Sequence, residues 1–305
     1  MPRTKKLALV REHQAEGRTG EIYSEIKQAL GVPHVNVIFQ AYAAYPAFLE
    51  LQWRALKPIL ETQEFFAFAE RLRADAYTRM CNYFRIPDFT AGLRSSGTKE
   101  LAELANVVEL FHYNNPPLLL IAAAQLQAFD SSLEQVPRVR AVSTPAAHPV
   151  FTEKPALVEE AVASAAIRRI YDDIKRTFGL PFVNTDYRAF ARWPDFLQLY
   201  WSVLKPLTQS PVYAESQHGI RETAVTLARE LPQRFELGAT KLADKGISED
   251  DIAAVLRITE LFVKLLSGLV LNVALAKIGW EGGSDAGATI KNLGEDERLF
   301  PERAA

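Results

Sequence analysis

The chain carries IYSEIKQALGVPHVNVIFQAYAAYPAFLELQWRALKP at residues 22–58 and IYDDIKRTFGLPFVNTDYRAFARWPDFLQLYWSVLKP at residues 170–206, two versions of one pattern. At an offset of 148 positions, 18 of the 37 residues are identical. A shorter match follows at an offset of 151, where Glu-Leu-Phe at residues 109–111 recurs at residues 260–262. A repeat of this length indicates that one structural unit is used twice.

The repeated segment predicts helices separated by short corners. Apolar residues recur every four positions over residues 20–30, and Gly31 is a natural end for that helix. We expect a short helix after Asn36 and a longer helix over residues 46–60, which begins at a proline. Asn36 and its counterpart Asn184 are expected to cap the short helix of each copy through their side chains.

The fold class follows from the whole pattern. Residues 118–126 and 261–276 are apolar nearly all round, as in helices at the centre of a core. Alternating patterns typical of strands are scarce. We therefore expect an all-α protein in which two similar helical bundles pack as an internal pseudo-dimer. The expected organisation is a first repeat over 1–130, a Pro-rich linker over 131–156, a second repeat over 157–281 and a flexible C-terminal tail over 282–305.

Composition excludes several classes of function. Of the 305 residues, 48% are hydrophobic and 24% charged, the balance of a globular protein with a core. A formal net charge of −2 argues against a general nucleic-acid binder, which needs a basic face. Cys81 is the single cysteine, so a disulfide within the chain and any multi-cysteine metal or redox site are excluded.

Membrane and export signals are weak in this sequence. The longest apolar run, residues 265–276, is interrupted by Ser267 and Asn272 and falls short of the roughly 20 residues of a membrane span. The basic first residues precede only a four-residue apolar segment, too short for a signal-peptide core. We expect a cytoplasmic protein with no membrane partner.

The two copies differ most in chemistry at one position of the short helix. Residues 36–39 read NVIF, whereas residues 184–187 read NTDY, so Asp186 replaces an apolar Ile38. One interpretation is a first-turn acid that complements the helix dipole. The other is a carboxylate in an apolar pocket that acts as a general base. Burial would raise its pKa and the helix start would lower it.

A second difference precedes a pair of prolines. Asn114 and Asn115 stand before Pro116 and Pro117, where the second copy has LLSG at residues 265–268. The prolines predict that one helix ends here and another begins. The two asparagines either close that helix end or hold a water or a substrate oxygen.

Together these features resemble a known family. The repeat, the Thr-Asp that follows Val-Asn in the second copy, and the Asn-Pro break before an apolar helix are similar to the group I 2-haloacid dehalogenases, which act on D- and L-2-haloacids. The resemblance covers about residues 18–280. It implies an all-helical internal pseudo-dimer, related in fold to the alkylhydroperoxidase-D and carboxymuconolactone decarboxylase group. It further implies an active site between the halves, no cofactor or metal, a small halogenated carboxylic acid as substrate, and a homodimer.

The resemblance also implies roles for individual residues. Asp186 matches the catalytic aspartate, whose activated water attacks the substrate Cα and displaces halide with inversion, without an ester to the enzyme. Asn115 matches the residue that orients this water, with Asn114 as the alternative. The implied substrate-binding residues are Phe39, Tyr42 and Ala43 from the first half, Leu118 and Thr185 near the catalytic pair, and Phe262, Leu265, Leu266 and Leu269 from the last long helix.

Two departures from the family pattern support rival functions. Leu118 stands where the family often has an aromatic residue, and Phe39 where a larger indole can occur. A non-catalytic helical protein that binds a small molecule or a partner is therefore one alternative. An enzyme of the carboxymuconolactone decarboxylase or alkylhydroperoxidase-D type is the other, although the peroxidase chemistry needs a cysteine pair and Cys81 is alone.

Overall fold

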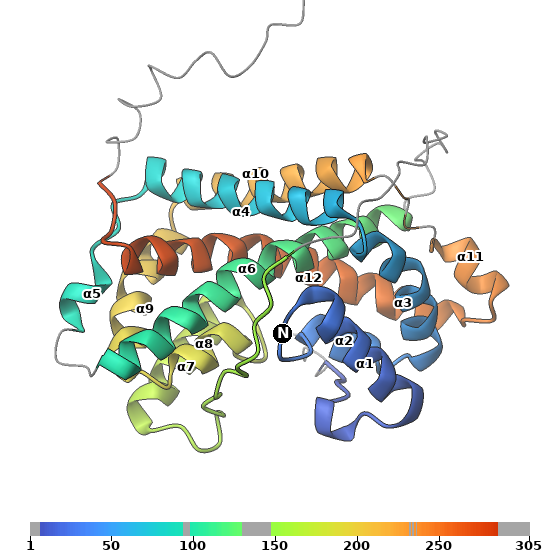
Figure 1. Cartoon of the computed structure of the whole chain (residues 1–305), viewed down its shortest axis with the longest axis horizontal. Helices are drawn as coiled ribbons and strands as arrows, with labels where there is room; N and C mark the ends of the chain where they lie inside the picture. Colours follow the sequence, from blue (N-terminus) through green and yellow to red (C-terminus); the bar gives the residue numbers. More distant parts are fainter. Residues whose placement is uncertain are drawn as a thin grey trace, which may run out of the picture.

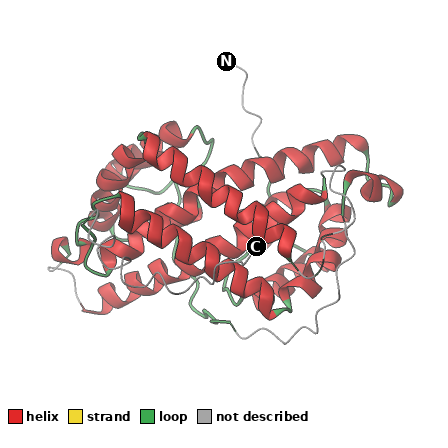
Figure 2. Cartoon of the chain, turned by 90° about the horizontal axis from the view of Figure 1, so that it is seen from above, coloured by secondary structure: helices red, strands yellow, loops and turns green. Residues whose placement is uncertain are grey.

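The protein is helical in the part of the chain that the structure describes. The computed structural model describes residues 7–93, 98–129, 148–231 and 237–285, together with Gln233 and Phe235. The first group of helices is η1 Glu12–Gln14, α1 Gly17–Leu30, α2 Val37–Tyr42, α3 Pro46–Leu60, α4 Gln63–Tyr83, α5 Phe89–Gly92 and α6 Thr98–Ala128. The second group is α7 Ala165–Phe178, α8 Thr185–Phe190, α9 Pro194–Thr208, α10 Pro211–Glu230, α11 Ala239–Asp244 and α12 Glu249–Trp280. The described residues contain no strand longer than an isolated bridge, such as the one between Ile86 and Ser284, so the all-α prediction is confirmed (Figure 2).

The order of the α-helices repeats. Within the described residues, α1 to α6 are followed by α7 to α12 in the same sequence of long and short elements. Both α1 and α7 have 14 residues, α2 and α8 have six, and α3 and α9 have 15. We call residues 7–129 the first half and residues 158–285 the second half. The sequence repeat therefore corresponds to a repeat of structure.

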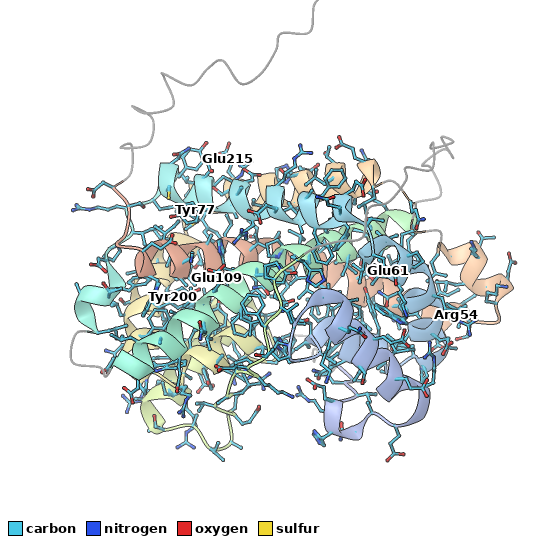
Figure 3. The ribbon with its side chains drawn as sticks, in the orientation of Figure 1. Arg54, Glu61, Tyr77, Glu109, Tyr200 and Glu215 are labelled. Carbon is cyan, nitrogen blue, oxygen red and sulfur yellow. The ribbon has the colours of Figure 1, made fainter. Side chains whose placement is uncertain are left out.

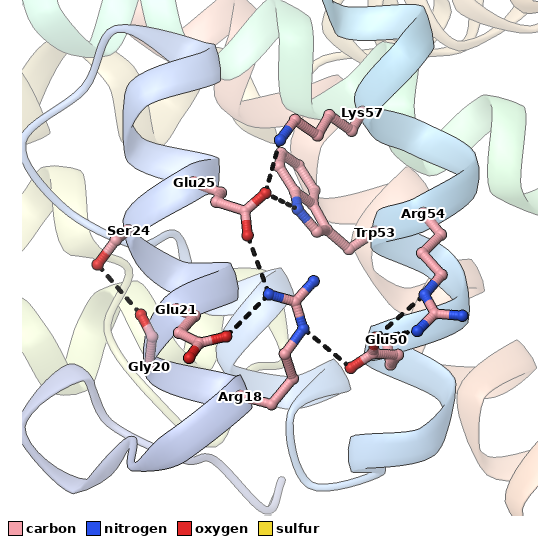
Figure 4. Close-up of polar contacts among 9 residues, drawn as sticks. All are labelled: Arg18, Gly20, Glu21, Ser24, Glu25, Glu50, Trp53, Arg54 and Lys57. Carbon is pink, nitrogen blue, oxygen red and sulfur yellow. Dashed lines mark hydrogen bonds and ion pairs between the residues drawn. The ribbon is translucent and has the colours of Figure 1, made fainter.

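Specific side-chain contacts repeat as well. The carboxylate of Glu25 on α1 accepts hydrogen bonds from Trp53 Nε1 at 3.0 Å and Lys57 Nζ at 2.8 Å on α3 (Figure 4). In the second half Asp173 occupies the place of Glu25 and accepts from Trp201 Nε1 at 3.0 Å. Exposed ion pairs add little stability by themselves. A hydrogen bond to an indole that packs into the core fixes the position of the first helix of each half relative to the third. Both halves have this hydrogen bond.

The two longest helices form the centre of the molecule. Helices α6 and α12 pack along each other, while α4 and α10 cover one side of them (Figure 1). Helices α1–α3 lie at one end of this centre and α7–α9 at the other (Figure 1). The fully buried Tyr200 lies among the helices, whereas the exposed Glu215 points outward from α10 (Figure 3).

Helix α6 contradicts the predicted break at the proline pair. It continues from Thr98 to Ala128 with Pro116 and Pro117 inside it. A proline lacks the N–H that would bond the carbonyl four residues earlier, so the break was a reasonable expectation. The helix persists because the residues on both sides of the pair are buried among other helices, and tertiary packing outweighs local propensity. The interpretation that the asparagines close a helix end is therefore wrong.

Helix α12 is apolar enough to resemble a membrane span. Over the described residues, it alone combines the length and hydropathy of such a helix, and 78% of its most apolar window is buried inside the protein. Ser267 and Asn272 interrupt its apolar run, so a criterion based on uninterrupted apolar residues does not detect this helix. Its buried polar residue Asn272 is hydrogen-bonded to tyrosine hydroxyls, as expected for a core helix.

The predicted linker and tail are only partly described. The linker lies outside the described residues up to Ala147, and from His148 onward it runs over the first half, where Phe151 N donates to Gly31 O at 2.8 Å. The tail lies outside them from residue 286 onward. Its first residues turn back, and Ser284 exchanges two backbone hydrogen bonds with Ile86, at 2.8 and 2.9 Å.

Two equivalent glycines end the first helix of each half. Gly31 follows α1 with φ 64°, and Gly179 follows α7 with φ 65°. Both lie in the left-handed region that favours glycine. Their surroundings differ. A Cβ on Gly31 would meet the carbonyl oxygen of Pro149 and the His148 ring, while a Cβ on Gly179 would meet nothing within 4 Å.

We therefore expect Gly31→Ala to destabilise the protein more than Gly179→Ala. Both variants incur the backbone cost of about 1–2 kcal/mol for a left-handed alanine. Only Gly31→Ala also pushes the segment around His148 away from α1. Urea unfolding followed by circular dichroism measures both losses against the parent protein. Equal losses would contradict the structural difference between the two sites.

Candidate active site

Asp186 and Asn115 meet inside the protein. Asp186 is the second residue of α8, Asn115 lies in the middle of α6, and the Asn115 Nδ2 atom donates to Asp186 Oδ2 at 2.8 Å. Both side chains are buried, at 4% and 2% exposure. Asn114 is also buried, but its amide has no hydrogen-bond partner among the described residues. Consecutive residues of a helix point in different directions, so only Asn115 reaches the acid.

The pair lines a small cavity, with a volume of about 40 Å³, between the two halves. Most of its walls come from residues that are equivalent in the repeat, at offsets of 148 or 151. These pairs are Asn36 with Asn184, Val37 with Thr185, Ile38 with Asp186, Phe111 with Phe262, Asn115 with Leu266, and Leu118 with Leu269; Phe182 and Leu265 complete the lining. The cavity is thus built from matching positions, and its ionisable group comes from one half only.

Burial dominates the electrostatics of Asp186. Loss of water around the carboxylate raises its pKa from 3.8 to about 6. The hydrogen bonds from Asn115 and from a backbone N–H oppose this rise in pKa, and so does the positive charge of Arg188. Near neutral pH the group is therefore mainly a carboxylate that water solvates poorly. This balance favours the general-base interpretation over that of an acid that only complements a helix start.

Thr185 and Arg188 support the start of α8. Arg188 is buried, forms an ion pair with Glu159 at 2.8 Å and donates to Thr185 Oγ1 at 3.4 Å. Thr185 itself lines the cavity, next to Asp186. Arg188 is not among the site residues expected from the sequence. Its counterpart in the first half is Gln40, so the difference between the copies was a signal that could have revealed it.

The two cap asparagines behave differently from the prediction. Asn36 and Asn184 do occupy the N-cap positions of α2 and α8, but neither side chain makes a capping hydrogen bond. Both amide atoms of Asn184 and the Oδ1 atom of Asn36 are buried without a partner among the described residues. Both residues line the cavity instead. Their side chains therefore offer unused hydrogen-bonding groups to a bound molecule.

The first-half wall is made by different residues from those predicted. Phe39, Tyr42 and Ala43 are buried in the core and do not line the cavity. The Tyr42 hydroxyl bonds Thr259 Oγ1 at 2.8 Å instead. Val37 and Ile38 line the cavity instead. They occupy the positions in the first half that Thr185 and Asp186 occupy in the second. The repeat alignment therefore indicated the correct first-half wall residues, whereas the resemblance to the dehalogenase family indicated residues next to them in the sequence.

The remaining predicted residues lie around the same cavity. They are Leu118 on α6 and Phe262, Leu265, Leu266 and Leu269 on α12. Phe111 and Phe182 were not identified, although Phe111 is the repeat partner of Phe262. In the described part of the chain, no three His, Cys, Asp or Glu side chains come together as a metal site would require. Apart from the asparagines and Thr185, the walls around the acid are apolar and aromatic.

The buried carboxylate has a consequence for stability. Its pKa is higher in the folded protein, about 6, than the ordinary value of 3.8. Because the folded protein binds this proton more tightly than the unfolded chain, protonation of Asp186 increases the free energy of unfolding at low pH. This increase is lost as pH rises from about 4 to about 6. We expect Asp186→Asn to be more stable than the parent protein at pH 8 by up to about 3 kcal/mol, with little difference near pH 4.

Urea unfolding of both proteins at each pH measures this difference. Asp195→Asn, a change at an exposed acid on α9, serves as the control and should show no comparable gain. A parent protein that equals Asp186→Asn in stability at pH 8 would contradict the desolvation of this carboxylate.

Comparison with known proteins indicates the family of this chain. The family model described as halocarboxylic acid dehydrogenase DehI matches residues 33–180. An (R)-2-haloacid dehalogenase of Pseudomonas putida is 32% identical over 286 residues, which cover 90% of this chain and 93% of that protein. A configuration-inverting 2-haloacid dehalogenase of Pseudomonas sp. (strain 113) is 24% identical over 93% of this chain and 94% of its own length.

Solved structures with a similar fold are 2-haloacid dehalogenases as well. A D-2-haloacid dehalogenase mutant superimposes with a TM-score of 0.84 at 32% identity, covering 89% of this chain and 94% of the other. A complex of such a mutant with D-2-CPA has a TM-score of 0.84 at 31% identity, covering 90% and 96%. The shared fold and the level of identity over nearly the full length lead to one conclusion: this chain belongs to the 2-haloacid dehalogenase family.

Proposed function

We propose that this protein hydrolyses the carbon–halogen bond of short 2-haloalkanoic acids and releases 2-hydroxy acids and halide. The observation that carries the proposal is the contact between Asn115 and the buried Asp186 in an apolar cavity. The relatives described above bear the names of 2-haloacid dehalogenases, which supports the same reaction.

The geometry suits a water as the nucleophile. Asn115 donates a hydrogen bond from Nδ2 to one oxygen of Asp186, which leaves its own Oδ1 atom able to accept a hydrogen bond from water. A water held between that oxygen and the carboxylate would have one proton directed at a base. The poorly solvated carboxylate is a stronger base than an exposed aspartate because its pKa is raised to about 6. General-base assistance of this kind contributes about 10²–10⁴-fold to a rate.

The reaction is a direct displacement. The water oxygen attacks the substrate Cα from the side opposite the halogen, while Asp186 takes the proton. The new C–O bond forms as the C–halogen bond breaks, halide leaves with the bonding electron pair, and the configuration at Cα inverts. Asp186 then returns the proton to solvent. No bond between Asp186 and Cα forms, so no ester intermediate occurs.

The walls supply recognition for both ends of the substrate. Leu118, Phe262 and Leu266 give an apolar surface that suits the halogen and the alkyl group. The unpartnered Nδ2 group of Asn184 can donate to the substrate carboxylate.

We further propose a preference for the (R)-enantiomer. The resemblance to the group I enzymes suggests that both enantiomers react. The relatives at 32% identity are named for the (R)-enantiomer, and the solved complex holds D-2-CPA.

Thiol chemistry has little support in this structure. Cys81 is partly buried, and burial raises the pKa of its thiol, which disfavours the reactive thiolate. A non-catalytic binding protein remains the rival that the departures at Leu118 and Phe39 suggest. Phe39 does not reach the cavity, so only the change at Leu118 bears on its shape.

Halide release from (R)-2-chloropropionate by the purified protein tests the proposal. We expect turnover by the parent protein, slower turnover of the (S)-enantiomer, and a loss of at least about 100-fold in Asp186→Asn, which removes the base. Circular dichroism should show that the variant keeps its helices. Absence of halide from both enantiomers with a folded parent protein would refute the dehalogenase proposal.

The two asparagines allow a matched test of the water-binding role. Asn115→Leu and Asn114→Leu each introduce the residue that the second half has at that position. We expect Asn115→Leu to lower kcat by about 100-fold because the water loses its alignment, and Asn114→Leu to have a much smaller effect. The reverse order would assign the water to Asn114.

The raised pKa of Asp186 predicts the pH dependence. A general base must be ionised, so kcat/KM should rise with pH, reach half its maximum near pH 6 and level off about one pH unit higher. The 2-haloacid is itself ionised throughout this range and does not contribute to the profile. A plateau that extends down to pH 4 would show that Asp186 is exposed to solvent or is not the base.

Isotopic labelling tests the absence of an ester. In a single turnover in H₂¹⁸O, direct attack places ¹⁸O in the hydroxy acid. If the label appears first on the protein, attack by Asp186 on Cα is the first step instead.

A further inference from the structure

A second cavity adjoins the reaction cavity. It has a volume of about 300 Å³ and lies in the second half, among the ends of α7 and α9, the start of α10, and α12. It shares Asn184, Leu265 and Leu269 with the lining of the reaction cavity. Its rim includes the exposed residues Gly179 and Lys264. The second cavity therefore lies beside the site of the reaction and reaches the surface at Gly179 and Lys264.

In the first half, a segment of the chain covers the equivalent place. Phe151 donates its N–H to Gly31 O at 2.8 Å, and its ring lies 5.3 Å from that of Tyr113. In the second half Gly179 takes the place of Gly31, and a Cβ there would meet nothing within 4 Å. Lys264 takes the place of Tyr113. Among the described residues, one groove is closed by the linking segment, and its counterpart is open.

The polar groups in the second cavity are of two kinds. Tyr213, Asn272 and Tyr187 are bonded to one another, through Tyr213 Oη to Asn272 Oδ1 at 2.6 Å and Asn272 Nδ2 to Tyr187 Oη at 3.0 Å. These groups are already satisfied. Asn184 has no partner for either amide atom among the described residues, although it is only 5% exposed. Lys264 is the one charged side chain among the described residues of the lining, which include no Asp or Glu.

We propose that this second cavity is the entrance vestibule of the enzyme and binds the haloacid as an anion before it reacts. The proposal rests on the function proposed above. Lys264 at the rim attracts and first binds the substrate carboxylate, and Asn184 donates to that carboxylate at the junction between the two cavities. A single positive charge in a concave site without carboxylates concentrates small anions. Halide and the 2-hydroxy acid leave by the same route.

A charge reversal at the rim tests the vestibule. At pH 8, where Asp186 is ionised in any case, we expect Lys264→Glu to lower kcat/KM for 2-chloropropionate by about tenfold at low salt and by less at high salt, because salt screens the attraction. We expect kcat to stay within about twofold, since Lys264 does not line the reaction cavity.

Lys245→Glu is the matched control. It changes the net charge of the protein equally, at an exposed residue beyond α11 that lines neither cavity. Its kcat/KM should equal that of the parent protein. If Lys264→Glu and Lys245→Glu have the same effect, or if neither has one, Lys264 does not guide the substrate and the proposal is overturned.

A bulky side chain at the rim tests the route itself. Leu261 lines the vestibule but not the reaction cavity. We expect Leu261→Trp to reduce kcat/KM several-fold, and more for 2-chlorobutyrate than for chloroacetate, because the larger acid needs a wider passage. Leu256→Trp, at a position of α12 outside both cavities, is the control. Equal kinetics for these two variants would show that substrate enters elsewhere.

A binding measurement separates this proposal from the proposed reaction. Calorimetry with 2-chloropropionate on Asp186→Asn, with and without Lys264→Glu, reports binding without turnover. A Kd at least about fivefold weaker with Lys264→Glu supports the vestibule even if the parent protein releases no halide, in which case only the proposed reaction fails. Halide release by the parent protein together with an unchanged Kd would leave the reaction intact and overturn the vestibule.

Discussion

The packing of α6 against α12 is the constraint on which the rest of the structure depends. These helices carry equivalent residues of the two halves, and their contact brings those residues to opposite walls of one small cavity. The short helices α2 and α8 then add a second set of equivalent residues. A carboxylate on α8 can meet an amide on α6 only because this central pair fixes both halves in one arrangement. The apolar surroundings that raise the pKa of Asp186 come from the same contact.

A symmetric framework therefore holds an asymmetric chemistry. At the position of Asp186 the first half has Ile38, and at the position of Asn115 the second half has Leu266. Two buried carboxylates facing one another would repel and would share a proton. With a single acid opposite an aliphatic side chain, the site keeps one base and one apolar wall. The free-energy cost of burying a charged group in this cavity thus arises from one residue only.

The amino-acid sequence predicted the all-helical architecture and singled out Asp186 and Asn115, two residues far apart in the chain that the structure brings into contact. The repeat predicted matching helices, and the chemical difference between the two copies at Asp186 located the acid. Three details depend on packing and could not be obtained in this way. Packing against buried neighbours keeps α6 helical at Pro116. The Asn184 side chain lines a cavity and does not cap its helix. The orientation of α2 places Ile38, not Phe39, on the cavity wall.

The segment at Phe151 has a consequence for how such a molecule could have been assembled. Two separate copies of the unit, related by an exact two-fold axis, would have no connecting segment, and both grooves beside the equivalent glycines would be open. Joining the copies in one chain supplies a connecting segment that can cover only one of them, as it does beside Gly31. The covalent joining of two like units is thus itself a source of difference between the two ends of the protein, independent of any substitution within either unit.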